Sequence, residues 1–130
     1  MTSASRAGQR RELAREEWAP YFDVLNKRLE QGLRLDAAVE VTSEATDGTE
    51  AEALPLVSIT YEKHDDQIAI GLGGRGPRFP AALWHYVDHP TLVWVRENGD
   101  IPVAIGIEGG DEDRTYTFVR VDSIGGRAGQ

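Results

Sequence analysis

Residues 56–73 read LVSITYEKHDDQIAIGLG and contain two runs in which apolar residues occupy every second position. In residues 56–62 the alternating residues are Val57, Ile59 and Tyr61. In residues 67–73 they are Ile68, Ile70 and Leu72. A period of two is typical of half-buried strands, and the polar KHDD between the runs is typical of a turn. The stretch therefore predicts a β-hairpin.

The same reasoning extends to other short segments. Alternation predicts strands over residues 33–41, 92–95, 103–108 and 115–121. Asn98-Gly99, between the second and third of these, is a strong turn signal. Residues 81–87 fit a strand or a short helix, and we favour a strand because Pro90 follows too soon for a helix.

A different period precedes the strands. Apolar residues at spacings of four, three and four predict an amphipathic helix that begins near Arg15 or Glu16 and ends at Gly32. Its apolar face consists of Trp18, Phe22, Leu25 and Leu29.

Together these elements predict an α+β fold, in which the N-terminal amphipathic helix packs on an antiparallel β-meander of six or seven strands. We expect a disordered arm over residues 1–12, a single domain over residues 13–121 and a flexible tail over residues 122–130. A chain of 130 residues is long enough to bury a hydrophobic core without the help of disulfide bonds or a bound metal ion.

Composition narrows the function classes. A formal net charge of −8 disfavours binding to nucleic acid. The chain has no cysteine, so disulfide frameworks, thiolate metal sites and cysteine nucleophiles are excluded. No apolar run is long enough to cross a bilayer and the first twenty residues contain no signal-peptide pattern, so we expect a cytoplasmic protein without a membrane partner.

Gly71-x-Gly73-x-x-Gly76 has the glycine spacing of a dinucleotide-binding turn. That turn must lead into a helix, and Pro77 and Pro80 prevent one here. A smaller anion is compatible with the loop, because glycine backbone and arginine forks bind phosphate or carboxylate. Arg75, Gly76 and Arg78 are therefore a candidate anion site, and the alternative is a plain flexible connection.

His85 and His89 lie in HYVDH, which resembles the inverted zinc-protease pattern of two histidines four residues apart. The sequence departs from this pattern, because Asp88 replaces the glutamate and Pro90 disfavours a helix. The two histidines are a candidate metal pair without an identified third ligand. Alternatively, one packs beside Trp84 or Tyr86 and the other caps a turn.

Small residues alternate with aliphatic ones in two predicted strands, at Ala69, Gly71 and Gly73 and at Ala104 and Gly106. Such a face admits another backbone or sheet. Trp94, Tyr116 and Phe118 would add aromatic area, so these three residues are a candidate interaction surface. The alternative is that they complete the core.

Three segments, REEWAPYFDVLNKRLE, EAEALPLVSITYEKHDDQIAIGLGG and HYVDHPTLVWV, resemble a bacterial family of unknown function, family 5335. The resemblance covers residues 13–121 and implies a tryptophan-containing helix followed by strands. It implies no activity, ligand or catalytic residue.

No serine lies in a nucleophile elbow and no cofactor motif is complete. We therefore expect a non-catalytic module without a cofactor, which binds itself as a homodimer or binds another protein. The alternative is an anion-binding protein or enzyme centred on the loop of residues 71–78 and on His85 and His89.

Overall fold

The computed structural model of the chain describes residues 9–43, 49–50, 53–74, 81–110 and 114–123. This part of the chain is mostly β-structure, with one helix of 16 residues and nine strands. Their bounds are β1 (Arg10–Leu13), α1 (Arg15–Glu30), β2 (Leu35–Ser43), β3 (Thr49–Glu50), β4 (Leu54–Glu62), β5 (Gln67–Leu72), β6 (Leu83–Asp88), β7 (Leu92–Asn98), β8 (Ile101–Gly109) and β9 (Thr115–Ser123).

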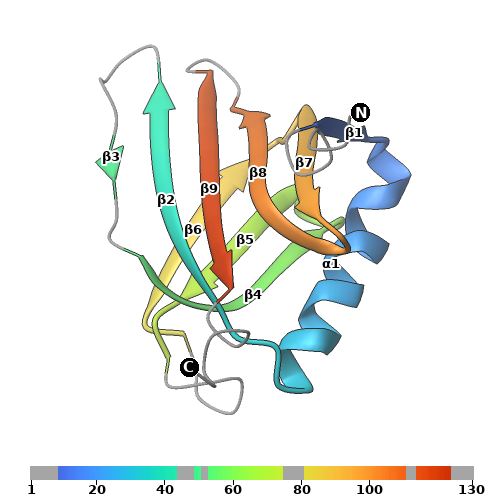
Figure 1. Cartoon of the computed structure of the whole chain (residues 1–130). Coiled ribbons are helices and arrows are strands. Elements are labelled where there is room, and N and C mark those ends of the chain that lie inside the picture. The colour runs from blue at the N-terminus through green and yellow to red at the C-terminus, as the bar shows by residue number, and fades with distance from the viewer. Residues whose placement is uncertain (1–8, 44–48, 51–52, 75–80, 111–113, 124–130) are drawn as a thin grey trace.

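All the strands pair antiparallel, in the order β1-β7-β8-β9-β2-β4-β5-β6, with β3 beside β2. The sheet folds back on itself where β2 meets β4, through only the pairs Asp36–Pro55 and Ala37–Leu54. A front layer of β1, β7, β8, β9 and β2 therefore faces a back layer of β4, β5 and β6 (Figure 1).

The predicted α+β fold is wrong. In a meander β6 would pair with β7, but β6 ends the back layer and β7 lies in the front layer. The last strand returns to pair with β2 along nine residue pairs, from Leu35–Ser123 to Ser43–Thr115. This long-range pairing buries Val39 against Val119 between the layers, a gain that local periodicity does not reveal.

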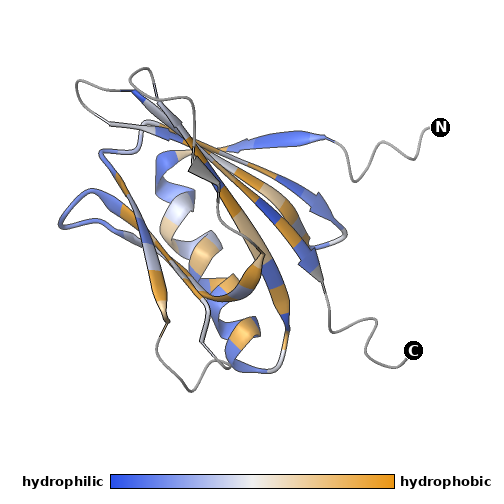
Figure 2. Ribbon diagram, turned by 90° about the vertical axis from the view of Figure 1, so that its left-hand side faces the viewer, coloured by the Kyte–Doolittle hydropathy of each residue, from blue (hydrophilic) through white to orange (hydrophobic). Residues whose placement is uncertain are grey.

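Helix α1 closes the open side between the two layers (Figure 2). It contacts β4 in the back layer and β1 and β7 in the front layer. Its buried face consists of Trp18, Phe22, Leu25 and Leu29, as the spacing predicted. The ring of Trp18 meets that of Tyr61 edge to face at 5.1 Å. The helix thus fills one side of a folded sheet and does not lie flat on a meander.

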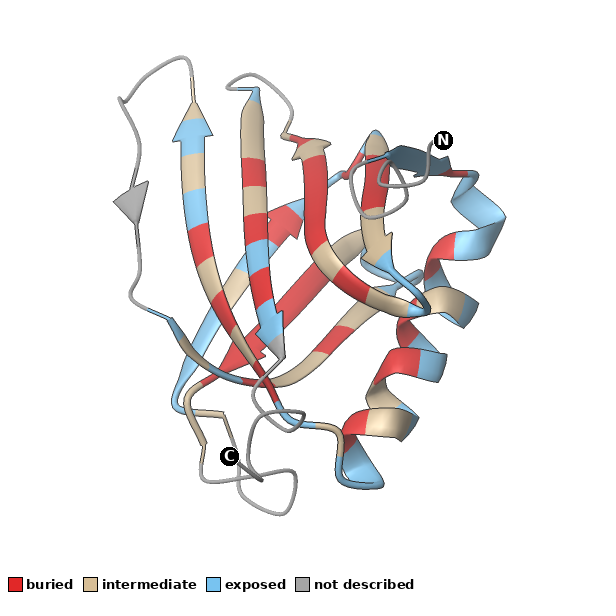
Figure 3. Ribbon diagram, viewed as in Figure 1, coloured by how far each residue is buried: buried red, intermediate tan, exposed pale blue. Residues whose placement is uncertain are grey.

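The core lies between the layers and against α1, and every long strand contributes buried residues to it (Figure 3). Residues 10–12, assigned from the sequence to a disordered arm, form β1 with Leu13, and β9 continues to Ser123, beyond the predicted domain end. The division into arm, domain and tail otherwise stays a prediction, because residues 1–8 and 124–130 lie outside the described residues.

Candidate functional site

The predicted anion site lies outside the described residues, since Arg75, Gly76 and Arg78 all fall within residues 75–80. Gly71, at the start of the same motif, pairs with Trp84 in the β5–β6 ladder. A Cβ atom added at Gly71 would lie 2.9 Å from the Trp84 ring. Likewise, one added at Gly106 would clash with the Trp94 ring. Both glycines therefore make room for a tryptophan of the same sheet, where we expected a second backbone.

The two histidines of the predicted metal pair have different surroundings. His85 lies within β6, opposite Ile70, on the inner face of the back layer. Burial lowers its pKa, and its Nε2 atom is buried without a hydrogen-bond partner among the described residues. His89 follows the strand with a φ of 50°, and its Nδ1 atom lies 3.2 Å from Oδ2 of Asp66.

No three histidine, aspartate or glutamate side chains gather into a metal site within the ranges that the structure describes. A metal role for His85 and His89 stays a prediction. Residues 81–87, which fitted a strand or a helix, lie mainly in β6, so the strand prediction is confirmed.

A polar cluster around Asp66 joins three parts of the chain. The Tyr61 hydroxyl donates to Oδ1 of Asp66 at 2.7 Å, and the Arg15 guanidinium approaches the same oxygen at 3.3 Å. Arg15 also donates to the carbonyl oxygen of Pro90 at 3.1 Å. These interactions, chiefly the hydrogen bond from Tyr61, hold the pKa of Asp66 below its ordinary value. The sequence indicates only that Asp66 lies in a turn, and nothing in the local sequence indicates its partners.

The predicted interaction residues Trp94, Tyr116 and Phe118 lie on the outer face of the front layer. Trp94 is only 4% exposed, because the Arg10 guanidinium lies 4.1 Å above its ring and Phe118 lies beside it. Tyr116 and Phe118 are half-buried. Trp94 thus has little surface left for a partner, and the interaction role of the three residues stays a prediction.

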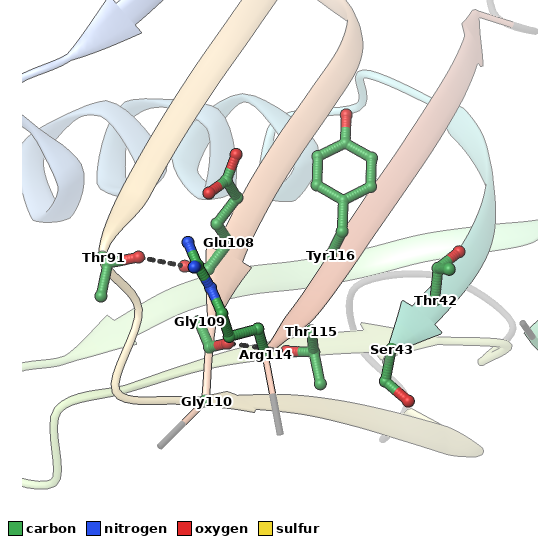
Figure 4. A pocket seen from close by; sticks show the side chains of 9 residues that line it. All are labelled: Thr42, Ser43, Thr91, Glu108, Gly109, Gly110, Arg114, Thr115 and Tyr116. Atoms are coloured by element: carbon green, nitrogen blue, oxygen red, sulfur yellow. Dashed lines mark hydrogen bonds between the residues drawn. The ribbon is translucent and has the colours of Figure 1, made fainter. Parts of the chain in front are cut away.

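A shallow groove of about 630 Å³ crosses the same face at the ends of β2, β8 and β9 (Figure 4). Glu108 and Tyr116, which pair across β8 and β9, line the groove. The hydroxyl groups of Thr91 and Thr115 donate to the backbone carbonyl groups of Glu108 and Gly109. The groove combines a carboxylate, the Arg114 guanidinium and hydroxyl groups, and none of the described side chains that line it is a buried polar group that selects one ligand class.

Exposed aromatic residues gather instead on β6, the last strand of the back layer. Trp84 is 44% exposed and Tyr86 is 57% exposed, and their rings stack with centroids 6.2 Å apart. Leu83, at the start of the same strand, is 40% exposed. Large apolar side chains grouped on an exposed strand mark an interaction surface.

The backbone of β6 is also open on one side, because no described strand lies beyond it. The Asn26 amide donates to the carbonyl oxygen of Ile59 at 2.9 Å and accepts from its N–H at 3.0 Å. Both groups of Ile59 therefore point away from β5. Along two antiparallel strands, hydrogen-bonded residue pairs alternate with non-hydrogen-bonded pairs. Ile59 and Ile70 form a non-hydrogen-bonded pair, so the N–H and C=O groups of Ile70 point away from β4 and toward His85 in β6.

It follows that the N–H and C=O groups of Trp84 and Tyr86 point to the open edge. The structure limits this edge at both ends. The Asp88 carbonyl already accepts from the Gly110 N–H, and the Ala82 N–H already donates to the Leu72 carbonyl, each at 2.8 Å. We call this surface the β6 edge, defined as the free backbone groups of Trp84 and Tyr86 together with the side chains of Leu83, Trp84 and Tyr86.

Comparison with known proteins supports the resemblance found in the sequence. The family of unknown function DUF5335 matches residues 9–124. The chain belongs to this family. The DUF5335 match spans α1 and all nine strands, so it covers both the Asp66 cluster and the β6 edge.

An uncharacterized protein of Aquifex aeolicus (strain VF5) is similar to this DUF5335 chain, with 30% identity over 111 residues, which is 84% of this chain and 88% of that protein. No solved structure matches. Within the described residues, no helix is both long enough and apolar enough to cross a membrane.

Proposed function

We propose that this DUF5335 chain is a self-associating protein-interaction module that binds through the β6 edge. The observation that carries the proposal is the pair of residues Trp84 and Tyr86, whose backbone groups have no partner among the described residues and whose rings are exposed on the same strand. Strand addition at such an edge uses main-chain hydrogen bonds for affinity and the flanking side chains for selectivity.

Two other strand edges of the described residues support this choice. The outer edge of β1 carries charged side chains at Arg10, Arg11 and Glu12, and charges at an edge discourage pairing. The edge of β4 is covered by α1, and Asn26 occupies both backbone groups of Ile59 there. β6 has neither form of protection along residues 83–87.

The charge distribution is compatible with a second copy as the partner. The chain carries a net charge of −8, so two copies repel each other over most of their surfaces. Residues 83–87 contain no Asp, Glu, Lys or Arg. Two acidic copies therefore meet at this strand with the least like-charge contact.

The proposal is tested by sedimentation of the wild type, Tyr86→Lys and a matched control, Val24→Lys. A lysine at an edge strand opposes pairing. Val24 is 60% exposed on α1, so its replacement introduces the same charge away from β6. We expect a dimer for the wild type and Val24→Lys, and a dissociation constant at least tenfold higher for Tyr86→Lys. A monomeric wild type at high micromolar concentration would overturn the proposal, as would equal weakening by both variants.

A further inference from the structure

We propose that two copies of β6 pair antiparallel about a twofold axis that passes through His85. This inference rests on the proposed function and adds the arrangement of the two copies. In a closed dimer with twofold symmetry, each copy presents the same surface to the other. The β6 edge is self-complementary in one register.

The register follows from which backbone groups are free. If Trp84 lies opposite Tyr86 of the second copy, both residues form hydrogen-bonded pairs, and all four free groups of each edge find a partner. If Trp84 lay opposite Trp84 of the second copy, Tyr86 would have to pair with Ala82, whose N–H is already bonded to Leu72. If Tyr86 lay opposite Tyr86 of the second copy, Trp84 would have to pair with Asp88, whose carbonyl is already bonded to Gly110. Of these registers, only the one with its axis at His85 avoids both conflicts.

The side chains match in the same register. On the outer face, Trp84 of each copy lies beside Tyr86 of the other, which extends the stacked pair into a cluster of four rings. On the inner face, Leu83 of each copy lies opposite Val87 of the other. Leu83 is 40% exposed in the single chain, so this pairing gives it an apolar neighbour.

The axis brings His85 of one copy opposite His85 of the other in a non-hydrogen-bonded pair, in which Cα atoms lie about 4.5 Å apart. Disulfides form between Cα atoms roughly 4.4–6.8 Å apart. Because the chain has no cysteine, the variant His85→Cys contains a single thiol. We expect mild oxidation to convert most of it to a disulfide-linked dimer that a reductant returns to monomer.

Leu83→Cys is the matched control. Its side chain is exposed, but the proposed register separates Leu83 from its own counterpart by about four residues, or roughly 14 Å at 3.4 Å per residue. We expect at least tenfold less cross-linked dimer from this variant. Thermal unfolding of both reduced variants verifies that each is folded.

A second measurement needs no substitution. In an equal mixture of isotope-labelled and unlabelled wild type, filtered NMR spectra should show contacts between the Trp84 and Tyr86 rings of different copies. Absence of these contacts in a sample that sediments as a dimer would overturn the arrangement, as would efficient cross-linking of Leu83→Cys. In either case a dimer that Tyr86→Lys weakens would leave the proposed function standing. A wild type that sediments only as a monomer would overturn both.

Discussion

At the scale of single residues, Asn26 determines how the back layer ends. Its side-chain amide bonds to both backbone groups of Ile59, as a neighbouring strand would. Through this one residue the helix covers the edge of β4. Hydrogen-bonded and non-hydrogen-bonded pairs alternate from Ile59 onward, so the backbone groups of Trp84 and Tyr86 point to the open side of β6. This amide covers the edge of β4, and its bonds to Ile59 show which backbone groups of β6 point to the open edge.

Replacing Asn26 by alanine should lower the free energy of unfolding by about 1–3 kcal/mol, because two backbone groups at a packed position lose their hydrogen-bond partner. Urea unfolding measures the change. Lys27→Ala, at an exposed position of the same helix, is the control and should change stability by less than about 0.5 kcal/mol. Equal effects of the two substitutions would show that the Asn26 amide contributes nothing specific.

At the scale of elements, the Asp66 cluster ties the start of α1 to two turns. Asp66 lies in the β4–β5 turn and His89 lies between β6 and β7, and the His89 N–H donates to the Asp66 carbonyl at 2.8 Å. Both residues have positive φ, near 50°, a conformation that non-glycine residues adopt at a cost. The polar contacts of Asp66 with Arg15, Tyr61 and His89 offset this cost.

Asp66→Asn should destabilise the protein at neutral pH and lose this effect in acid. The pKa of Asp66 is lowered below 3.8 in the folded protein, so its charge stabilises the fold above that value. This stability is lost as pH falls through the folded-state pKa. Asparagine tolerates the positive φ, so the backbone need not change.

Urea unfolding at a series of pH values from 6 to 2 measures the difference in the free energy of unfolding between the wild type and the variant. It should be largest near pH 6 and shrink below about pH 3.8. Asp65→Asn, an exposed neighbour, should show no such trend. A difference that stayed constant with pH would show that the Asp66 charge does not act through these contacts.

The elements themselves were largely predictable, because each depends on local periodicity. Alternation located the cores of β4, β5, β8 and β9, and the helical spacing located the buried face of α1. β1 was missed because Arg10, Arg11 and Glu12 are charged, and its pairing with β7 compensates for their weak strand preference. The Asp66 contacts were missed because the partners come from distant segments.

At the scale of the whole molecule, the sequence could not reveal the sheet order, because strand pairing depends on contacts between distant segments. β9 could as well have ended a meander, and β6 lies at an edge because β7 pairs with β1 and β8 and not with β6. The edge position opens the backbone of Trp84 and Tyr86, and their place on the outer face of the back layer exposes their rings. Their sequence pattern equally fits a central strand, so the β6 edge was not predictable from residues 83–88.

The proposed dimer predicts an alternating pattern of amide exchange along β6. The His85 N–H faces β5, so it should exchange slowly at every protein concentration. The N–H groups of Trp84 and Tyr86 face the open edge, so they should exchange rapidly when the protein is dilute and at least tenfold more slowly above the dissociation constant. Hydrogen exchange followed by NMR at two concentrations measures all three amides.

The outer edge of β1 is the internal control, since its free amides should not respond to concentration. Protection of Trp84 and Tyr86 at infinite dilution would mean that their groups are bonded within one chain, and the open edge would not exist.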